Sequence, residues 1–242
     1  MNDINKVFQY LRYVRIDKFD NVKVDKYPDI NYKHYIRYPR FWLKRLFKSN
    51  SNSKILLNLL RKRRSVRKFG IGNIKFEQLN FILSSSLGVS DLNKYYRTYP
   101  SAGALYPVEC YLLVQNRIDL LTPGVYHYNF FLNCLELINS EINDNTATSI
   151  FGDNAFQNTS VYIILTCIPS RLTWKYRVRG LGFIYIEAGH IGQNIYLTSL
   201  AQKVGCVSLG GFIDRKVINL LKIREDYEYP IYALALGLED KK

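Results

Sequence analysis

The chain has 242 residues, of which 48% are hydrophobic and 14% aromatic, and its formal net charge is +14. This hydrophobic content excludes an intrinsically disordered chain, and no apolar run approaches the roughly 20 residues that span a bilayer. The first residues, MNDINKVFQYLRYVR, mix charges through the apolar positions and lack the apolar region of a secretory signal, so we expect a cytoplasmic protein.

The excess positive charge lies at one end of the sequence. Residues 1–75 contain 20 Lys and Arg against 5 Asp and Glu, whereas residues 76–242 contain 14 and 15. A basic region of this kind could meet nucleic acid, an acidic protein or an anionic peptide. Because no zinc finger, RNP-like motif or helix-turn-helix pattern accompanies it, nucleic acid is the least favoured of these partners.

Cysteine and histidine give no sign of a disulfide framework or a metal site. The four cysteines are far apart and lie in or beside β-like apolar runs, which predicts buried free thiols; they are Cys110, Cys134, Cys167 and Cys206. The three histidines, His34, His127 and His190, do not have the spacing of metal ligands.

The sequence divides near residue 53. Residues 1–53 are rich in Tyr and Lys, lack a regular period and end in SNSNS, which is typical of a loop. We therefore predict a basic N-terminal extension over 1–53 and a main domain over 54–242. The main domain opens with two predicted helices: one has apolar positions 55, 56, 59 and 60, and the other covers 74–88 with Gly88 as its C-terminal stop.

Strands and one long helix follow. We predict a strand over 108–115, a hairpin over 124–138 that turns at 131–133, a short helix within 139–160 and a buried strand over 161–168. The strongest helix lies within 181–204, with Gly205 just beyond its end, and two β-like runs close the domain at 206–213 and 229–237. Gly189 and Gly192 each cost this helix about 1 kcal/mol relative to Ala, which indicates close approach of a ring or a backbone. The pattern predicts an α+β fold with a mostly antiparallel or mixed sheet flanked by helices.

Three segments of the main domain could hold a ligand. In RKRRSVRKF, the alternating residues Arg63, Ser65 and Arg67 could face a phosphate, although a solvated helix end is the simpler interpretation. In YPSAGALYP, small residues after Ser101 would let a planar ligand approach, and in SLGGF the N–H groups of Gly210 and Gly211 could meet a polarised ring atom. Ordinary turns or a bulge explain these two equally well. No Walker, G-x-G-x-x-G or G-x-S-x-G element is present.

These segments occur in a recognisable order. RRSVRKF, YPSAGALYPVECYL, GVYHYN, WKYRVRG, EAGHIGQNIYL and SLGGF together resemble the flavin-dependent nitroreductase superfamily over about residues 54–238. More narrowly, they resemble its SagB-type or McbC-like branch, the FMN-dependent thiazoline and oxazoline dehydrogenases of ribosomal-peptide maturation. The resemblance implies an interlocked homodimer that binds FMN at its interface, with a cyclodehydratase and a precursor peptide as partners.

The resemblance also implies roles for individual residues. Arg63, Arg64, Ser65 and Arg67 would hold the phosphate and ribityl chain of FMN. Pro100, Ser101, Ala102 and Gly103 would approach the flavin ring across the subunit boundary, and Gly210 and Gly211 would lie near flavin N5 and O4. The C-terminal ALALGLEDKK lacks the basic phosphate clamp of more general nitroreductases.

Lys175 and Tyr176, within TWKYRVRG, match the Lys-Tyr pair that the branch associates with azoline dehydrogenation. Azole formation removes a proton as well as a hydride, so the site needs a base. The guanidiniums of Arg177 and Arg179 would favour the phenolate and the neutral amine, and the residues leave open which of the two takes the proton. Neighbouring side chains diverge on a regular helix or strand, so we predict an irregular loop here.

Two rival functions remain at this point. One is an NAD(P)H-dependent nitro or quinone reductase on the same fold, and the other is a non-catalytic scaffold subunit. The predicted extension over 1–53 would dock a cyclodehydratase partner or the peptide.

Overall fold

A six-stranded antiparallel sheet forms the centre of the protein. The computed structural model describes residues 3–18, 39–40, 42–43 and 50–240. The strand order is β5-β4-β3-β6-β8-β7 and every neighbouring pair is antiparallel, which confirms the predicted sheet. The strands are β3 (Val108–Val114), β4 (Gly124–Asn129), β5 (Cys134–Asn139), β6 (Val161–Cys167), β7 (Val204–Ser208) and β8 (Tyr229–Leu238).

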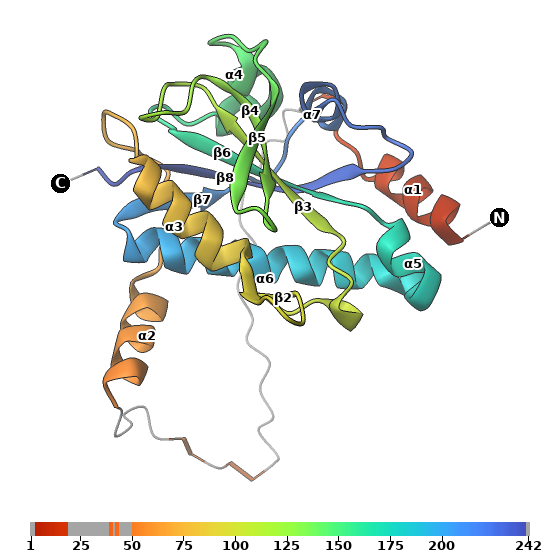
Figure 1. Ribbon diagram of the computed structural model, residues 1–242, viewed down its shortest axis with the longest axis horizontal. Coiled ribbons are helices and arrows are strands. Elements are labelled where there is room, and N and C mark those ends of the chain that lie inside the picture. The colour runs from red at the N-terminus through yellow and green to blue at the C-terminus, as the bar shows by residue number, and fades with distance from the viewer. Residues whose placement is uncertain (1–2, 19–38, 41, 44–49, 241–242) are drawn as a thin grey trace.

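The two central strands are buried along their whole length because helices cover both faces of the sheet (Figure 1). Successive side chains of a strand point to opposite faces, so Leu112 joins one hydrophobic core and Leu113 the other. The first core is completed by α3 (Phe76–Leu87) and α6 (Gly180–Ala201), and the second by α4 (Thr146–Phe151) and α7 (Asp214–Leu221).

Short elements surround the end of α6. They are the hairpin of β1 (Val89–Asp91) and β2 (Tyr96–Arg97), the 3-10 turn η1 (Ala102–Ala104), helix α5 (Ser170–Tyr176) and the 3-10 turn η3 (Arg177–Arg179). A further 3-10 turn, η2 (Gly152–Asn154), follows α4. Figure 1 shows α5 at one end of α6, beyond the edge of the sheet. This arrangement brings the segment between β2 and β3 close to α5.

The glycines of α6 bear out one part of the sequence-based reasoning. A Cβ at Gly192 would lie 2.7 Å from Cε1 of the Tyr232 ring, so the expected close approach of a ring is confirmed there. A Cβ at Gly189 would meet nothing within 4 Å. Within this chain, therefore, only Gly192 of the two is required by packing.

Residues 3–18 are part of the packed structure. In α1 (Asp3–Tyr13), Val7, Phe8 and Leu11 are buried and share a core cluster with residues of α6 and α7. The segment after α1 is held by Asp214, whose Oδ2 accepts the N–H of Ile16 at 2.9 Å. The side chain of Arg15 also pairs with Glu225 at 3.3 Å. Residues 3–18 thus complete the core next to α6 and α7.

Several sequence-based expectations need correction. Ser51–Ser53 form the first turn of α2 (Ser51–Lys62) rather than a loop, because Oδ1 of Asn50 accepts the N–H of Ser53 at 2.8 Å and caps the helix. The expected apolar face of α2 exists but is uncovered in the described chain, with Ile55 63% exposed. Figure 1 shows α2 extending away from the sheet.

The long helix ends earlier than its glycine suggested. It ends at Ala201, Lys203 takes the left-handed conformation with φ 57°, and Gly205 belongs to β7. Helix α7 was not predicted. All four cysteines are free, as expected, but Cys134 is half-buried rather than buried.

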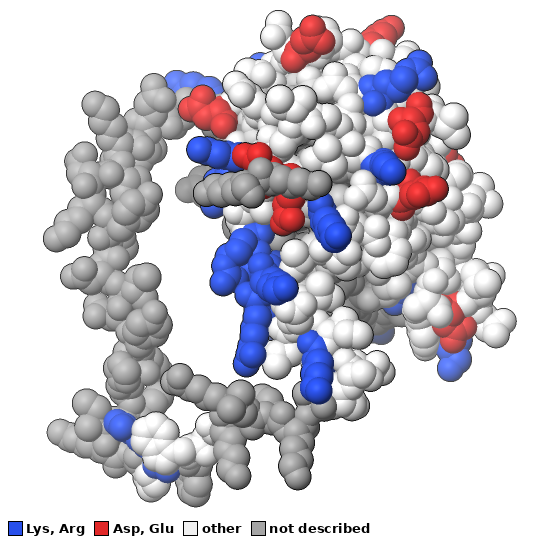
Figure 2. Space-filling model, turned by 90° about the vertical axis from the view of Figure 1, so that its left-hand side faces the viewer, with Lys and Arg blue, Asp and Glu red and all other residues white. Residues whose placement is uncertain are grey.

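The described surface is basic beside α2. Figure 2 shows a group of Lys and Arg side chains on the face that carries α2 and the C-terminal end of the chain. The basic residues of α2 and the following segment are exposed there, apart from the half-buried Arg63; the exposed ones include Arg61, Lys62, Arg64, Arg67 and Lys68. In the described residues no helix is long and apolar enough to cross a membrane, and no cluster of His, Cys, Asp and Glu could hold a metal ion.

Candidate functional site

The hydroxyl of Tyr196 connects two of the segments singled out in the sequence. It lies 3.1 Å from Oγ of Ser65, in the segment after α2, and accepts the backbone N–H of Ser208 at 2.7 Å. The Arg63 guanidinium lies 5.1 Å from the centroid of the Tyr196 ring. Arg63 and Ser65 therefore face the same side, as the alternating pattern predicted, and that side adjoins the end of β7.

The other two arginines of this segment are placed differently. Arg64 turns back to the end of α2, where its Nη1 donates to the carbonyl oxygens of Arg61 at 2.9 Å and Arg63 at 2.8 Å. Arg67 is exposed. The backbone between them is fixed to β7 because the N–H of Val66 donates to the carbonyl of Cys206 at 3.0 Å. The structure thus brings Arg63 and Ser65 together and uses Arg64 as a helix cap.

The second segment, Pro100–Gly103, is a tight turn at the start of η1. Oγ of Ser101 accepts the N–H of Tyr106 at 2.9 Å, which closes the turn. Gly103 has φ 65°, in the left-handed region that favours glycine. Pro100 and Gly103 are exposed, while Ser101 and Ala102 are half-buried. The small residues leave the backbone of this turn open on one side.

Lys175 and Tyr176 converge on that open side. A Cβ at Gly103 would lie 3.0 Å from Oη of Tyr176 and 3.1 Å from Nζ of Lys175. The ammonium of Lys175 is 5.3 Å from the centroid of the Tyr176 ring. The two neighbouring polar groups therefore meet at one point, next to the Pro100–Gly103 turn.

The backbone that presents this pair is not the predicted loop. Lys175 and Tyr176 form the last turn of α5, and the irregularity follows at Arg177, whose φ is 55°. At the end of a short helix two consecutive side chains can still meet, because Lys175 is long enough to reach over the Tyr176 ring. Arg177 turns away and pairs with Asp3 of α1 at 3.3 Å, so its charge is partly neutralised there.

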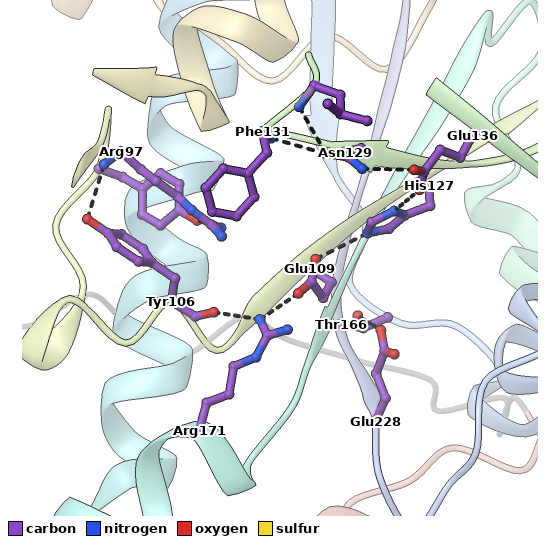
Figure 3. A network of polar contacts seen from close by, with 12 residues as sticks. Arg97, Tyr106, Glu109, His127, Asn129, Phe131, Glu136, Thr166, Arg171 and Glu228 are labelled. Atoms are coloured by element: carbon purple, nitrogen blue, oxygen red, sulfur yellow. Dashed lines mark hydrogen bonds and ion pairs between the residues drawn. The ribbon is translucent and has the colours of Figure 1, made fainter. Parts of the chain in front are cut away.

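A polar network fixes α5 to the sheet (Figure 3). Arg171, one turn before Lys175, pairs with the buried Glu109 of β3 at 2.5 Å and donates to the Tyr106 carbonyl at 2.8 Å. Nε2 of His127 lies 3.1 Å from Glu109, and its Nδ1 lies 2.9 Å from Glu136. The network runs from the sheet surface to the helix that carries Lys175.

The contacts within this network shift the pKa values of His127 and Glu109. The hydrogen bond to Glu109 raises the pKa of His127, with a further contribution from Glu136. Burial works to raise the pKa of Glu109, but the hydrogen bond from His127 and the charge of Arg171 outweigh it, so the pKa of Glu109 is lowered. Glu109 is therefore a carboxylate that holds Arg171, and not a candidate acid.

Glu187 of α6 is a second buried carboxyl near the turn. It is 1% exposed, and neither of its oxygens has a hydrogen-bond partner within 3.5 Å in the described chain. Burial raises the pKa of Glu187 to about 7, and weaker polar influences from Ser101, Val108 and Arg97 work against this rise. The group therefore changes its charge near neutral pH.

The third segment borders a separate cavity of about 310 Å³ at the end of β7. Gly210 and Gly211 line it together with Val14 and Ile16 from the segment after α1. A Cβ at Gly210 would meet nothing within 4 Å, so its backbone is unobstructed. Both glycines of the SLGGF segment therefore lie at the wall of a cavity.

Sequence reasoning missed Tyr196, Arg171 and Glu187. Recognition of α5 as a helix would have placed Arg171 on the face of Lys175, four residues later. Tyr196 and Glu187 both lie in the quoted motif EAGHIGQNIYL. Only the packed structure shows that Tyr196 has hydrogen-bond partners and that Glu187 is a buried carboxyl.

Known proteins are similar to the part of this chain that contains these segments. Residues 60–238 match the model of the Nitroreductase family. MJ1384 of Methanocaldococcus jannaschii, named as a predicted nitroreductase, is 31% identical over 183 residues, which cover 75% of this chain and 90% of that protein. The microcin B17-processing protein McbC of Escherichia coli is 26% identical over 163 residues, or 64% of this chain and 59% of McbC.

Solved structures share the fold. A chain of the E. coli microcin synthetase McbBCD complex, with truncated pro-MccB17 bound, superposes with a TM-score of 0.77 and 20% identity, covering 99% of this chain and 94% of that one. A predicted nitroreductase of Desulfovibrio desulfuricans in complex with FMN gives a TM-score of 0.51 at 17% identity, over 81% of this chain and 92% of the other. At these identities the likeness establishes the fold.

Proposed function

The chain belongs to the nitroreductase family, and we propose that it is an FMN-dependent oxidoreductase that converts thiazoline or oxazoline rings of a ribosomally made peptide into thiazoles or oxazoles. The observation that carries this proposal is the meeting of Lys175 Nζ and Tyr176 Oη beside Gly103. A base is required for azoline oxidation but not for simple transfer of a hydride from a nicotinamide. The similarity to McbC, named as a microcin-processing protein, supports the same class of substrate.

The residues fit a bound FMN. Arg63 and Ser65 face one side and, with the exposed Arg67, supply cations and a hydroxyl for a phosphate. Gly210 and Gly211 line a cavity at the end of β7, and Tyr196 links Ser65 to Ser208, two positions before Gly210. Arg64, as a cap of α2, is the least suited of the predicted contacts. When bound, FMN supplies the hydride acceptor, and oxygen is the proposed final oxidant.

Lys175 and Tyr176 would remove the proton. The ring that is oxidised loses one hydrogen as a hydride and another as a proton, and the proton needs a base within hydrogen-bond reach. Both polar atoms lie about one hydrogen-bond length from the Gly103 side-chain position, which is the open face of the turn. The ion pair of Arg171 with Glu109 holds α5 so that the pair stays there. The residue that accepts the proton is left to experiment.

Partners follow from the same proposal. A second copy of the chain would bring its own Pro100–Gly103 turn to the flavin, and a cyclodehydratase would supply the azoline. The similarity to a chain of a complex named microcin synthetase supports a partner of this kind. The predicted docking role of residues 1–53 lies mainly outside the described residues, while α1 itself is packed into the domain.

Incubation of the FMN-loaded protein with a synthetic thiazoline peptide and oxygen tests the proposal. We expect mass spectrometry to show loss of two hydrogens from the peptide, without NAD(P)H. Reduction of a nitroarene or a quinone that depends on NAD(P)H, with the thiazoline untouched, would favour the reductase. A purified protein that does not take up FMN would favour the scaffold.

A further inference from the structure

A pocket of about 270 Å³ lies beside the Pro100–Gly103 turn, away from the cavity at Gly210. Its walls come from the β1–β2 hairpin, the residues after Gly103, the turn between β4 and β5, and α5; the residues used below are Lys94, Arg97, Tyr106, Phe130, Phe131 and Arg171. None of these residues belongs to the predicted FMN contacts. A cavity of this size holds a ligand fragment of about one or two amino-acid residues.

The pocket contains a buried cation without an acidic partner. Arg97 is 9% exposed and forms no ion pair in the described chain. The buried carboxyl of Glu187 feels its charge but is not hydrogen-bonded to it. Its one side-chain hydrogen bond among the described residues goes to Oη of Tyr99 at 2.6 Å, and its Nε has no partner. Arg171, on the opposite wall, is already neutralised by Glu109. A buried charge of this kind is costly unless an anion joins it.

Aromatic rings fix the orientation of the Arg97 guanidinium. Its Cζ lies 3.3 Å from the ring centroid of Phe130 and 4.5 Å from that of Tyr106. These rings pack against the guanidinium, whose hydrogen bonds form in its own plane. Figure 3 shows the guanidinium directed into the space between Tyr106 and Phe131, with Arg171 across from it. A planar carboxylate matches an in-plane guanidinium edge.

The pocket adjoins the reacting pair. Ala104 and Leu105 line it, and the Leu105 side chain lies 3.6 Å from the Cβ position of Gly103, where Lys175 and Tyr176 meet. A single extended ligand can therefore touch both places. Lys94, exposed at the entrance, adds a second cation.

We propose that this pocket binds a carboxylate of the peptide substrate, from an acidic side chain or the C-terminus close to the ring that is oxidised. The proposal rests on the proposed function for the nature of the substrate. It assigns to Arg97 the recognition of the anion, to the aromatic rings the packing of the neighbouring part of the ligand, and to Lys94 electrostatic attraction at the entrance.

Calorimetric titration of the FMN-loaded full-length protein with hippurate and with its neutral amide, hippuramide, tests the pocket. Both probes carry a flat ring and a peptide-like amide, and only hippurate carries a carboxylate. We expect hippurate to bind about tenfold more tightly. Arg97→Met should abolish this preference, Arg97→Lys should reduce it, and Lys94→Gln should reduce it a few-fold. Lys203→Gln, an exposed change after α6, is the matched control and should leave the preference unchanged.

Equal affinity for the two probes in the wild-type protein would overturn the proposal. A preference for hippurate that is unchanged in both the Arg97→Lys and the Lys94→Gln variant would also overturn it. These two variants can be measured even if Arg97→Met does not fold. Tighter binding of phenyl phosphate than of hippurate would overturn the assignment to a carboxylate in favour of a phosphate. Failure of every probe to bind would overturn the proposal as a whole. Hippurate binding needs no turnover, so failure of azoline oxidation would be seen separately.

Discussion

The hydroxyl of Tyr196 accepts the backbone N–H of Ser208 at 2.7 Å and, on its other side, lies 3.1 Å from Oγ of Ser65. One side chain of the central helix thus sets the distance between the basic segment after α2 and the glycine pair after β7. If these two segments hold opposite ends of FMN, cofactor affinity depends on a residue that need not touch the cofactor.

Replacing Tyr196 by Phe should therefore weaken FMN binding. The change removes hydrogen bonds that contribute on the order of 1 kcal/mol each, so we expect about tenfold weaker binding in a fluorescence titration with FMN. Tyr227→Phe, at a 51% exposed tyrosine, is the control and should bind FMN as the wild type does. Unchanged FMN affinity in the Tyr196 variant would show that these hydrogen bonds support the fold and do not influence cofactor binding.

Lys175→Ala and Tyr176→Phe separate the two candidate bases. Loss of a general base typically lowers the rate by about a hundredfold or more. We expect this loss of turnover on a thiazoline peptide in one variant and a smaller loss in the other, with FMN content unchanged in both by its visible spectrum. A double variant with full turnover would remove both residues from the reaction.

Gly103→Ala tests whether the open face of the turn is where the pair acts. The added methyl would lie 3.0 Å from Tyr176 Oη and 3.1 Å from Lys175 Nζ, at a residue with φ 65°. We predict a marked fall in kcat, measured per bound FMN because the turn is also proposed to approach the flavin. Gly182→Ala, which adds a methyl where nothing lies within 4 Å, is the matched control. Equal activity of the two variants would place the reaction elsewhere.

Glu187 should make stability depend on pH. Its pKa is raised by burial from 4.5 to about 7, so the native state binds the proton more tightly than the unfolded chain. The resulting stabilisation is complete below about pH 4.5 and is lost as the pH rises to 7 and above, by on the order of 3 kcal/mol. In thermal melts from pH 5 to 8, Glu187→Gln should flatten this decline. A parallel decline in wild type and variant would assign it to other groups.

Leu11→Ala tests whether α1 belongs to the folded domain. Leu11 is fully buried, so the cavity should lower the free energy of unfolding by about 2–5 kcal/mol in urea melts. Tyr13→Ala, at a side chain that is 86% exposed, should change it by less than about 1 kcal/mol. An unchanged free energy of unfolding in Leu11→Ala would indicate that α1 is dispensable for stability.

The sequence predicted elements where a local pattern decides them. The apolar positions of α3 and the continuous apolar runs of β3 and β6 were sufficient, as was the stop at Gly88. Predictions from local patterns were wrong where several residues could end or cap an element. Lys203, and not Gly205, takes the left-handed conformation after α6. Asn50 caps α2, so the end of SNSNS is the start of a helix and not a loop.

The candidate site could be predicted in its parts but not in its connections. The segments around Ser65, Gly103 and Lys175 were found from residue types and order, because the chemistry restricts those types. Tyr196 and Arg171 act through partners more than 60 positions away in the chain, at Ser65 and Glu109 or Tyr106. No local pattern contains such a contact, so only the packed structure reveals it.

The most direct measurement is the absorbance of the FMN-loaded protein in the absence of oxygen when a thiazoline peptide is added. The account predicts that the flavin band bleaches in the wild type without NAD(P)H, that thiazole forms in equal amount, and that the Lys175→Ala, Tyr176→Phe double variant does not bleach. Bleaching by NAD(P)H alone, with no response to the thiazoline peptide, would contradict the central claim.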